Sequence, residues 1–321
     1  MRALIADGVF PGVEAILRPL VNDLDLDLTI AAAREDARAR LPEVQLLILK
    51  NFALDAADIA TAHGLRGVQK LGLLTDSVDA KTLDRRGIPL RTLRLPSAVA
   101  VADHTLALIL ALSRQFVAGR LAMSLPSTVQ AIRTDERHFA YNWAGLSTSA
   151  LAGKSLGLIG FGEVAVEVAR RARAFGMRVR YTKRVPLPAA TERRFGVRFM
   201  PFESLLNQSD IVSVHVPHTS ETERLIGAGQ LASMKPGALL INTARGAIVD
   251  ETALIDSLNS GHLGGAGLDV FTVEPLPRDS PLLTAPRTVL SPHVAGAGSG
   301  ALAEAIASCL RRWQRILLGQ R

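Results

Sequence analysis

Cysteine is nearly absent from this 321-residue sequence, and aromatic side chains make up only 4% of it. With Cys309 as the only cysteine, an intramolecular disulfide and a metal site built from cysteines are both excluded. A reducing compartment is typical of such a chain, so a cytoplasmic location is expected. Hydrophobic residues nevertheless reach 48%, mostly small and aliphatic ones. This composition favours a compact α/β protein over a disordered chain.

Long apolar runs are also lacking. The most apolar stretch, 105–112, is far shorter than the roughly 20 residues that cross a bilayer, so no membrane partner is expected. The first residues include Arg2 where a signal peptide would need an apolar run, and they are typical of a first strand. The net charge is +7, but Lys and Arg are spread along the chain with few aromatics between them to stack bases. We therefore expect small anionic ligands and no nucleic acid.

Short apolar runs that alternate with helical patterns are abundant, and this rhythm predicts βαβ units and parallel sheets. The expected elements in the first third are strands at 2–6, 26–30, 46–49 and 67–71, with helices near 13–21 and 56–63. A long helix is predicted from 99 to 119, and the irregular stretch 124–149 is interpreted as an extended arm that could form a dimer contact. The βαβ rhythm returns from Ser155 to Ser291, and a helix is expected at 301–318.

The sequence therefore predicts an α/β protein with two doubly wound parallel-sheet domains. A Rossmann-type cofactor domain is assigned to residues 99–291, because a glycine motif follows the long helix. A flavodoxin-like substrate domain is assigned to residues 1–98 and 292–321. The crevice between the two lobes is the expected ligand site, and hinge closure there would exclude water.

The glycine motif Gly160-Phe161-Gly162-Glu163-Val164-Ala165 follows an apolar strand predicted at 155–159 and precedes a helix. This setting is the one a dinucleotide needs: Gly160 permits a tight turn, Gly162 lets backbone amides approach the pyrophosphate, and Ala165 keeps the helix close to the sheet. The phosphates would lie at the positive helix N-terminus. We expect Gly160, Phe161, Gly162, Glu163 and Val164 to bind the cofactor.

The next strand, 177–182, lacks the acidic residue that would bind the ribose 2′-hydroxyl of NAD. Lys183 and Arg184 follow Thr182 instead, and two cations there would pair with a 2′-phosphate. NADP(H) is therefore favoured, with NAD(H) as the alternative. A basic turn that only faces water is the other interpretation of these residues.

Three polar residues follow short apolar runs, read as buried strands, in the second half: Arg245 after 238–241, Glu274 after 267–270 and His293 after 288–290. Residues at the carboxyl ends of parallel strands line the ligand crevice of an open α/β sheet. A guanidinium can hold the carboxylate and carbonyl oxygens of a 2-keto acid in one plane, and an imidazole paired with a carboxylate is a suitable proton donor. Taken singly, each residue also fits a surface or structural role. Together they predict a site for hydride transfer.

At this point the sequence resembles the D-isomer-specific 2-hydroxyacid dehydrogenases, in particular the glyoxylate/hydroxypyruvate reductase branch. The resemblance covers nearly the whole chain. It is carried by the glycine motif and by the stretches 72–79, 101–106, 215–219, 234–237, 241–246, 268–275 and 291–293.

The resemblance implies that Arg245 binds substrate, that Glu274 partners His293, and that His293 is the general acid and base. It also implies a homodimer. The expected cofactor contacts outside the glycine motif are Thr182, Lys183, Arg184, Val216, Pro217, Thr243, Ala244, Asp269 and His293.

Substrate contacts are also expected from the first third of the chain. The resemblance implies that the backbone of the 72–76 loop, including Leu74 and Thr75, binds the substrate carboxylate, although Leu74 replaces a glycine usual in the family. Lys50, which follows the strand 46–49, faces the same crevice if the strand is correct, and we assign it carboxylate binding. His104 and His218 are interpreted as structural. No metal site is expected.

The function predicted from these residues is hydride transfer from NADPH or NADH to a small 2-keto acid such as glyoxylate or hydroxypyruvate, giving the D-2-hydroxy acid. The main alternative is a nucleotide-sensing interaction protein on the same scaffold, similar to the C-terminal-binding-protein corepressors. Among enzymes, phosphoglycerate dehydrogenase is less favoured because little sequence follows His293. Formate dehydrogenase is disfavoured because that family pairs the histidine with a glutamine where this chain has Glu274.

Overall fold

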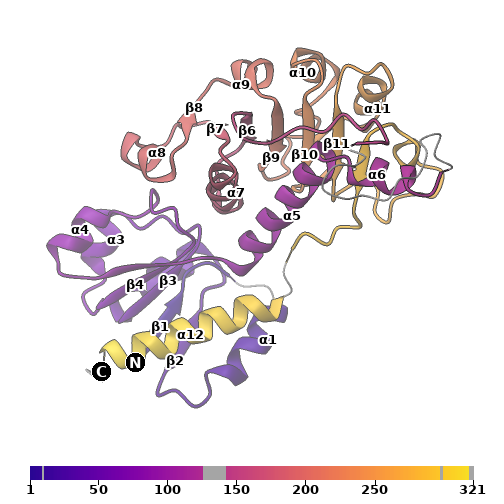
Figure 1. Ribbon diagram of the computed structural model, residues 1–321. Helices are drawn as coiled ribbons and strands as arrows, with labels where there is room; N and C mark the ends of the chain where they lie inside the picture. Colours follow the sequence, from indigo (N-terminus) through magenta and orange to yellow (C-terminus); the bar gives the residue numbers. More distant parts are fainter. Residues whose placement is uncertain (9–10, 126–141, 297–298, 318–321) are drawn as a thin grey trace, which may run out of the picture. The chain divides into compact units, whose positions relative to one another are not determined.

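A computed structural model describes residues 1–8, 11–125, 142–296 and 299–317 (Figure 1). The chain forms two compact units. Unit 1 combines Met1–Ala100 with Gly296–Arg321, and unit 2 contains Val101–Ala295. The predicted arm lies largely outside the described residues, because 126–141 are not among them.

Unit 1 is built on a five-stranded parallel sheet with the order β2-β1-β3-β4-β5. This order is that of the flavodoxin-like fold, as predicted. Its strands are β1 (Arg2–Ile5), β2 (Asp27–Ile30), β3 (Leu46–Leu49), β4 (Gly67–Leu71) and β5 (Leu90–Leu93). Its helices are α1 (Pro11–Leu20), α2 (Arg34–Arg40), α3 (Ala56–Thr61), α4 (Ala80–Arg85) and α12 (Ser299–Leu317), with a 3-10 turn η1 (Leu41–Glu43).

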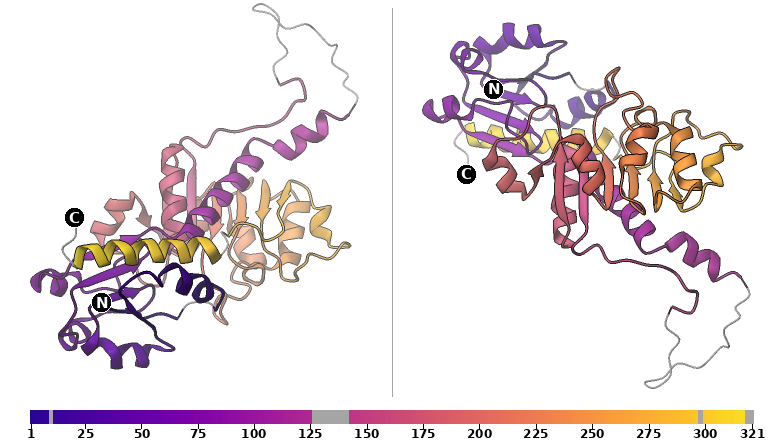
Figure 2. Two further views of the ribbon diagram at one scale, coloured as in Figure 1. Left: turned by 90° about the horizontal axis from the view of Figure 1, so that it is seen from below. Right: turned by 90° about the horizontal axis from the view of Figure 1, so that it is seen from above.

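The inner strands of unit 1 are buried along nearly their whole length, whereas the edge strands β2 and β5 are half-exposed. Helices on both faces of a parallel sheet require apolar residues on both faces, and this explains the continuous run Leu-Leu-Ile-Leu in β3. The last helix, α12, lies beside α1 (Figure 2). Its fully buried Trp313 packs against Gly67 of β4, and the indole nitrogen donates to Gln69 Oε1 at 2.9 Å.

Unit 2 is built on a seven-stranded parallel sheet with the order β12-β11-β10-β9-β6-β7-β8. Counted from β6, this is the Rossmann order with one further strand, which confirms the predicted fold class. Its strands are β6 (Ser155–Ile159), β7 (Arg178–Thr182), β8 (Arg198–Phe199), β9 (Ile211–Val214), β10 (Leu239–Asn242), β11 (Gly265–Leu268) and β12 (Thr288–Leu290). Its helices are α6 (Phe116–Ala122), α7 (Glu163–Ala174), α8 (Ala189–Phe195), α9 (Phe202–Gln208), α10 (Ala228–Ser233) and α11 (Glu251–Asn259), with 3-10 turns η2 (Gly246–Ile248) and η3 (Pro281–Leu283).

The predicted helix from 99 to 119 is wrong in its bounds. Helix α5 spans Pro96–Ser113 and crosses from unit 1 into unit 2, and α6 begins at Phe116. The two are separated because Gln115 adopts a left-handed backbone conformation with φ 54°, which an α-helix cannot contain. By length and composition α5 could span a bilayer, but a core helix meets the same criterion. Its Leu108 lies against Gly267 of β11 in unit 2.

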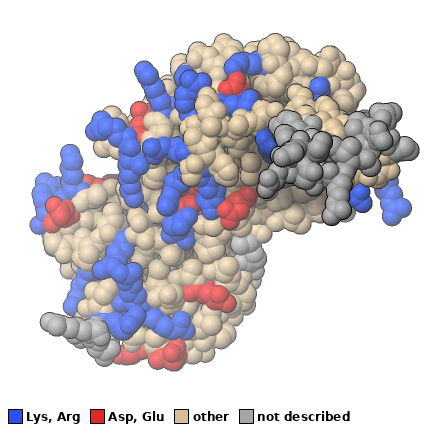
Figure 3. All heavy atoms as spheres, in the orientation of Figure 1, with Lys and Arg blue, Asp and Glu red and all other residues tan. Residues whose placement is uncertain are grey.

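Residues 292–295 were predicted to belong with the substrate domain, but the structure places them in unit 2. The reason is a set of hydrogen bonds to Asp269. The backbone N–H of His293 donates to the Asp269 carbonyl, and the N–H groups of Val294 and Ala295 donate to its carboxylate. On the face shown in Figure 3, Lys and Arg side chains are spread over the surface of each unit.

We predict that Gly67→Ala destabilises unit 1. A Cβ at this position would lie only 2.3 Å from the Trp313 ring, and the ring is held by its bond to Gln69. Overpacking of this kind typically costs about 1 to 3 kcal/mol. The measurement is the urea midpoint and slope of the variant. Gly300→Ala, in α12 of the same unit with open space around it, is the matched control and should be neutral or stabilising. A Gly67→Ala protein with an unchanged midpoint would contradict this account.

Candidate active site

Three neighbouring strands of unit 2 end at the same level of the sheet. Asn242, Leu268 and Leu290 are register partners on β10, β11 and β12, so the loops that follow leave from one edge of the sheet. The sequence placed the middle strand at 267–270, two residues late, because the glycines at its start were not recognised as strand residues. Gly265 and Gly267 are needed there, since a Cβ on either would press on the leucines of α5.

The loop after β10 carries Arg245. Buried Asn242 shapes this turn, because its side-chain oxygen accepts from the Ala244 N–H at 3.0 Å and its side-chain nitrogen donates to the Arg245 carbonyl at 2.9 Å. The next residue, Gly246, packs so tightly on the backbone after β11 that a Cβ would lie 1.9 Å from the Phe271 carbonyl carbon. The glycine therefore allows the two loops to touch, and the exposed Arg245 side chain lies beside the second loop.

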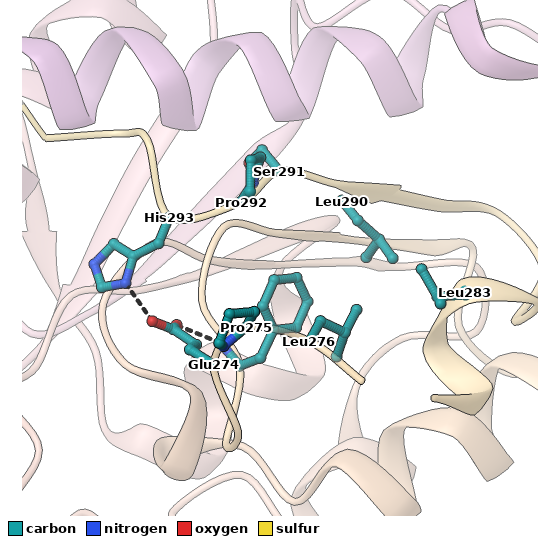
Figure 4. A pocket seen from close by; sticks show the side chains of 9 residues that line it. Glu274, Pro275, Leu276, Leu283, Leu290, Ser291, Pro292 and His293 are labelled. Carbon is teal, nitrogen blue, oxygen red and sulfur yellow. Dashed lines mark hydrogen bonds and ion pairs between the residues drawn. The ribbon is translucent and has the colours of Figure 1, made fainter. Parts of the chain in front are cut away.

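The loop after β11 carries Glu274, and the loop after β12 carries His293. Glu274 Oε2 and His293 Nδ1 form a hydrogen bond of 2.6 Å (Figure 4). The other carboxylate oxygen accepts from the Phe271 N–H at 2.9 Å, which fixes the orientation of the carboxylate. The two side chains are 34% and 46% exposed, so the pair faces an opening. Among the described residues, the second ring nitrogen of His293 has no hydrogen-bond partner, and it can reach a ligand.

The charge on Glu274 is stabilised by its neighbours. Partial burial would raise the pKa of its carboxyl group, but the hydrogen bonds from His293 and from the Phe271 N–H outweigh that effect. The positive charges of His293 and Arg245 act in the same direction, so the pKa of Glu274 lies below its usual value. The carboxylate consequently stays ionised throughout the neutral range.

The backbone at His293 has φ 53°, a left-handed conformation that is uncommon for residues other than glycine. Its N–H donates to the carbonyl of Asp269, and the carboxylate of Asp269 accepts from the two following N–H groups and from Ser291 Oγ. Asp269 is fully buried. It was predicted to contact the cofactor. In the structure its carboxylate holds the segment around His293, and the cofactor contact stays a prediction.

A cavity of about 620 Å³ opens beside the pair (Figure 4). One side presents Glu274 and His293, and the other is an apolar wall that includes Leu276, Leu283 and Leu290. A ligand with a polar end and an apolar or compact body would fit such a surface. No group of three or more His, Cys, Asp or Glu side chains that could hold a metal ion is found within the described ranges.

A second cavity in unit 2, of about 510 Å³, brings together five of the predicted cofactor contacts and Arg245. Val164, Val216, Pro217, Thr243, Ala244 and Arg245 line it, with Val101, His215 and His218. Arg245 thus borders this cavity and, through its charge, also acts on Glu274 of the first. Val101, His215 and His218 were not assigned to the site from the sequence, although all three lie within stretches that carried the family resemblance.

The glycine loop has the shape that a pyrophosphate requires. Gly160 has φ 90°, and a Cβ there would lie 2.6 Å from the His215 carbonyl oxygen, so only glycine fits. A Cβ at Gly162 would meet nothing within 4 Å, which leaves open space at the start of α7. Gly162 caps α7 without a side-chain hydrogen bond, so this residue does not shield the positive end of the helix from an anion. Phe161 is buried, and Glu163 and Val164 begin the helix.

The cations after β7 stand at the edge of the same loop, because the Gly160 N–H donates to the carbonyl of Thr182 at 2.9 Å. Arg184 is 89% exposed and its guanidinium lies 3.1 Å from the carboxylate of Glu221, itself exposed. Lys183 is half-buried. The sequence did not indicate Glu221, because its proximity to Arg184 arises only when the loops after β7 and β9 are folded.

The predicted substrate contacts Lys50, Leu74 and Thr75 belong to unit 1. Lys50 is exposed, and its backbone N–H is held by the Asp7 carboxylate at 2.5 Å. Leu74 is buried and Thr75 is half-buried. Their contact with a substrate stays a prediction.

Comparisons with known proteins identify the relatives of this chain. Residues 106–295 match the family model described as D-isomer specific 2-hydroxyacid dehydrogenase, NAD binding domain. The chain is 36% identical to a glyoxylate reductase of Korarchaeum cryptofilum, over 84% of this chain and 79% of the relative. It is 32% identical to a D-3-phosphoglycerate dehydrogenase of Archaeoglobus fulgidus, over 92% of this chain but 53% of that protein. The crystal structure of the TT0316 protein from Thermus thermophilus is similar, with a TM-score of 0.57, 34% identity, and coverage of 100% of this chain and 98% of that one.

Proposed function

The chain belongs to the D-isomer-specific 2-hydroxyacid dehydrogenases and is an oxidoreductase, and we propose that it reduces a small 2-keto acid such as glyoxylate or hydroxypyruvate to the D-2-hydroxy acid. The observation that carries this proposal is the hydrogen bond between Glu274 and His293 beside an open cavity, with Arg245 close enough to lower the pKa of Glu274. An interaction protein on the same scaffold has no need of such a pair, and it is not favoured.

The proposed mechanism assigns a role to each side chain. A bound nicotinamide cofactor supplies the hydride to the carbonyl carbon. Arg245 binds the carboxylate and carbonyl oxygen of the keto acid, and its charge stabilises the negative charge that develops on that oxygen. His293 donates the proton from the ring nitrogen that faces away from Glu274, so the oxygen becomes a hydroxyl. Glu274 holds the imidazole in orientation and favours its charged form before transfer.

The choice of a small keto acid is supported by the 36% identity to the glyoxylate reductase over 84% of this chain and 79% of that protein. A phosphorylated substrate is not favoured, because the described lining of the cavity beside Glu274 is apolar apart from Ser291, Glu274 and His293. A panel of glyoxylate, hydroxypyruvate and phosphohydroxypyruvate, assayed under identical conditions, tests the assignment. A higher kcat/KM for phosphohydroxypyruvate would overturn it.

NADPH is proposed as the preferred cofactor, with NADH as the alternative. Lys183 and Arg184 stand where a 2′-phosphate would lie if the cofactor follows the glycine loop. In an NADH-specific site, a carboxylate directly after this strand would accept a hydrogen bond from the ribose hydroxyl. Here Lys183 and Arg184 directly follow β7 instead. Glu221 opposes the preference, because its carboxylate pairs with Arg184 and would repel the phosphate. We therefore expect moderate discrimination.

A homodimer is also proposed. Helix α6 presents Phe116, Val117 and Leu121, each more than half exposed, next to the predicted arm. Exposed apolar side chains grouped on one helix are typical of a surface that another protein covers. Light scattering of the native protein and of Phe116→Ser/Leu121→Ser tests this, with Val185→Ser, an exposed valine elsewhere, as the control. A native protein that is monomeric at micromolar concentration would refute the dimer.

We predict that His293→Ala lowers kcat for reduction by roughly 10²- to 10⁴-fold, because general acid catalysis is lost. Glu274→Gln should lower kcat by a smaller factor, because general acid catalysis is only weakened. Arg245→Ala should raise KM and lower kcat together. Steady-state kinetics across the neutral pH range measure all three. Undiminished turnover of His293→Ala would remove His293 from the acid role.

We predict that kcat/KM is higher with NADPH than with NADH by about tenfold to a few hundredfold. Charge-assisted hydrogen bonds contribute about 1.5 to 3 kcal/mol when well formed, but solvent screening weakens them, and tenfold needs only about 1.4 kcal/mol. Lys183→Asp/Arg184→Ala should abolish the preference for NADPH, whereas Glu221→Gln should increase it. Cofactor dissociation constants from fluorescence provide an independent measure. Equal use of both cofactors by the native enzyme, or an unaltered ratio in the double variant, would sink this assignment.

A further inference from the structure

Helix α5 contacts the loops that carry Arg245 and His293 through two adjacent residues, His104 and Thr105. The hydroxyl of Thr105 lies 3.0 Å from that of Thr243, two residues before Arg245. Nε2 of His104 lies 2.7 Å from Ser291 Oγ, two residues before His293, and 3.3 Å from Asp269 Oδ1. Two side chains of α5 thus contact both of these loops.

The group that receives the His104 contact controls the backbone at His293. Asp269 is fully buried, and its carboxylate accepts from Ser291 Oγ at 2.6 Å, from the Val294 N–H at 3.0 Å and from the Ala295 N–H at 2.9 Å. These donors flank His293 on both sides. A left-handed conformation at such a residue persists only where the surrounding structure determines it, and here the Asp269 carboxylate provides that constraint.

The direction of the hydrogen bonds follows from the number of protons. The Ser291 hydroxyl has one hydrogen, which it donates to Asp269, so its oxygen can only accept from His104. Nε2 of His104 therefore carries a hydrogen, and that hydrogen points at Ser291 and Asp269. Within the described part of the chain, His104 and Ser291 are the side chains at hydrogen-bond distance from this carboxylate. Without His104, the partly buried Ser291 oxygen would lose its hydrogen-bond donor, which is unfavourable.

We propose that His104 is a positioning residue for the reduction: it acts through Ser291 and Asp269 to fix the backbone of His293, and thereby the alignment of its imidazole with Glu274. A half-buried histidine that merely satisfies its neighbours would have no effect on turnover. The proposal rests on the proposed role of His293 as the proton donor. It concerns kcat, because proton donation by His293 belongs to the chemical step, whereas the keto acid is bound by Arg245 in the proposed mechanism.

The test compares His104→Leu, which removes the donor, with His104→Gln, whose side-chain nitrogen can replace Nε2. We expect His104→Leu to lower kcat about ten- to hundredfold, the scale of a slightly misplaced catalytic group, with KM for the keto acid changed less than about twofold. His104→Gln should recover most of the loss. His262→Leu, which removes another half-buried histidine bonded through Nε2, to the Leu231 carbonyl, is the matched control and should keep native kcat.

A double variant separates positioning from general damage. In the His293→Ala background, His104→Leu should cause no further loss of turnover, because its effect passes through His293. If the His104→Leu protein does not fold, Ser291→Ala breaks the same chain of hydrogen bonds at the loop and should lower kcat in the same way. Native kcat in either folded variant, or a loss that persists in the double variant, would overturn the proposal. Full turnover in His293→Ala would instead refute the proposed function.

Discussion

The register of three parallel strands is the constraint on which the site depends. Asn242, Leu268 and Leu290 lie side by side at the ends of β10, β11 and β12, so three loops begin at the same height. A one-residue slip of any strand would turn its side chains to the other face of the sheet and move the loop that follows. The register therefore determines whether an arginine, a glutamate and a histidine far apart in sequence can act on one ligand.

Within that frame, close backbone packing and buried polar groups set the finer geometry. Gly246 lets the loop that carries Arg245 touch the backbone at Phe271. Asn242 closes the turn of that same loop through its hydrogen bond to the Arg245 carbonyl. Asp269 does for the third loop what Asn242 does for the first, because it accepts backbone N–H groups that would otherwise be unpaired. Both residues are buried at the end of a strand. The exposed side chains proposed for catalysis are thus held by buried neighbours that a ligand need not touch.

Much of the fold followed from the sequence, because parallel strands buried on both faces have a distinct composition. The apolar runs at β3, β6 and β12 were predicted with their observed bounds, and the glycine motif identified the cofactor-binding fold. The errors have local causes. The helix break at Gln115 depends on one residue in a left-handed conformation, and the start of β11 depends on glycines that are required by the packing of α5.

The site was less accessible to sequence reasoning. Its charged members stand after apolar runs, so Arg245, Glu274 and His293 could be identified, and the structure has the hydrogen bond between the last two. Residues that act through a neighbour carry no such pattern. His104 was interpreted as structural, and its contact with Ser291 joins positions 187 residues apart. The pairing of Arg184 with Glu221 is likewise a product of folding, and periodicity cannot reveal it.

The packing of Trp313 on Gly67 has a consequence for the order in which the chain matures during translation. Every residue of unit 2 has been synthesised before α12 is made, so β4 of unit 1 must wait for its covering indole until all of unit 2 has been made. Domains generally fold as units once their residues are available. The unit whose synthesis begins first is therefore completed last, and the part of β4 that Trp313 covers stays without that cover throughout the interval.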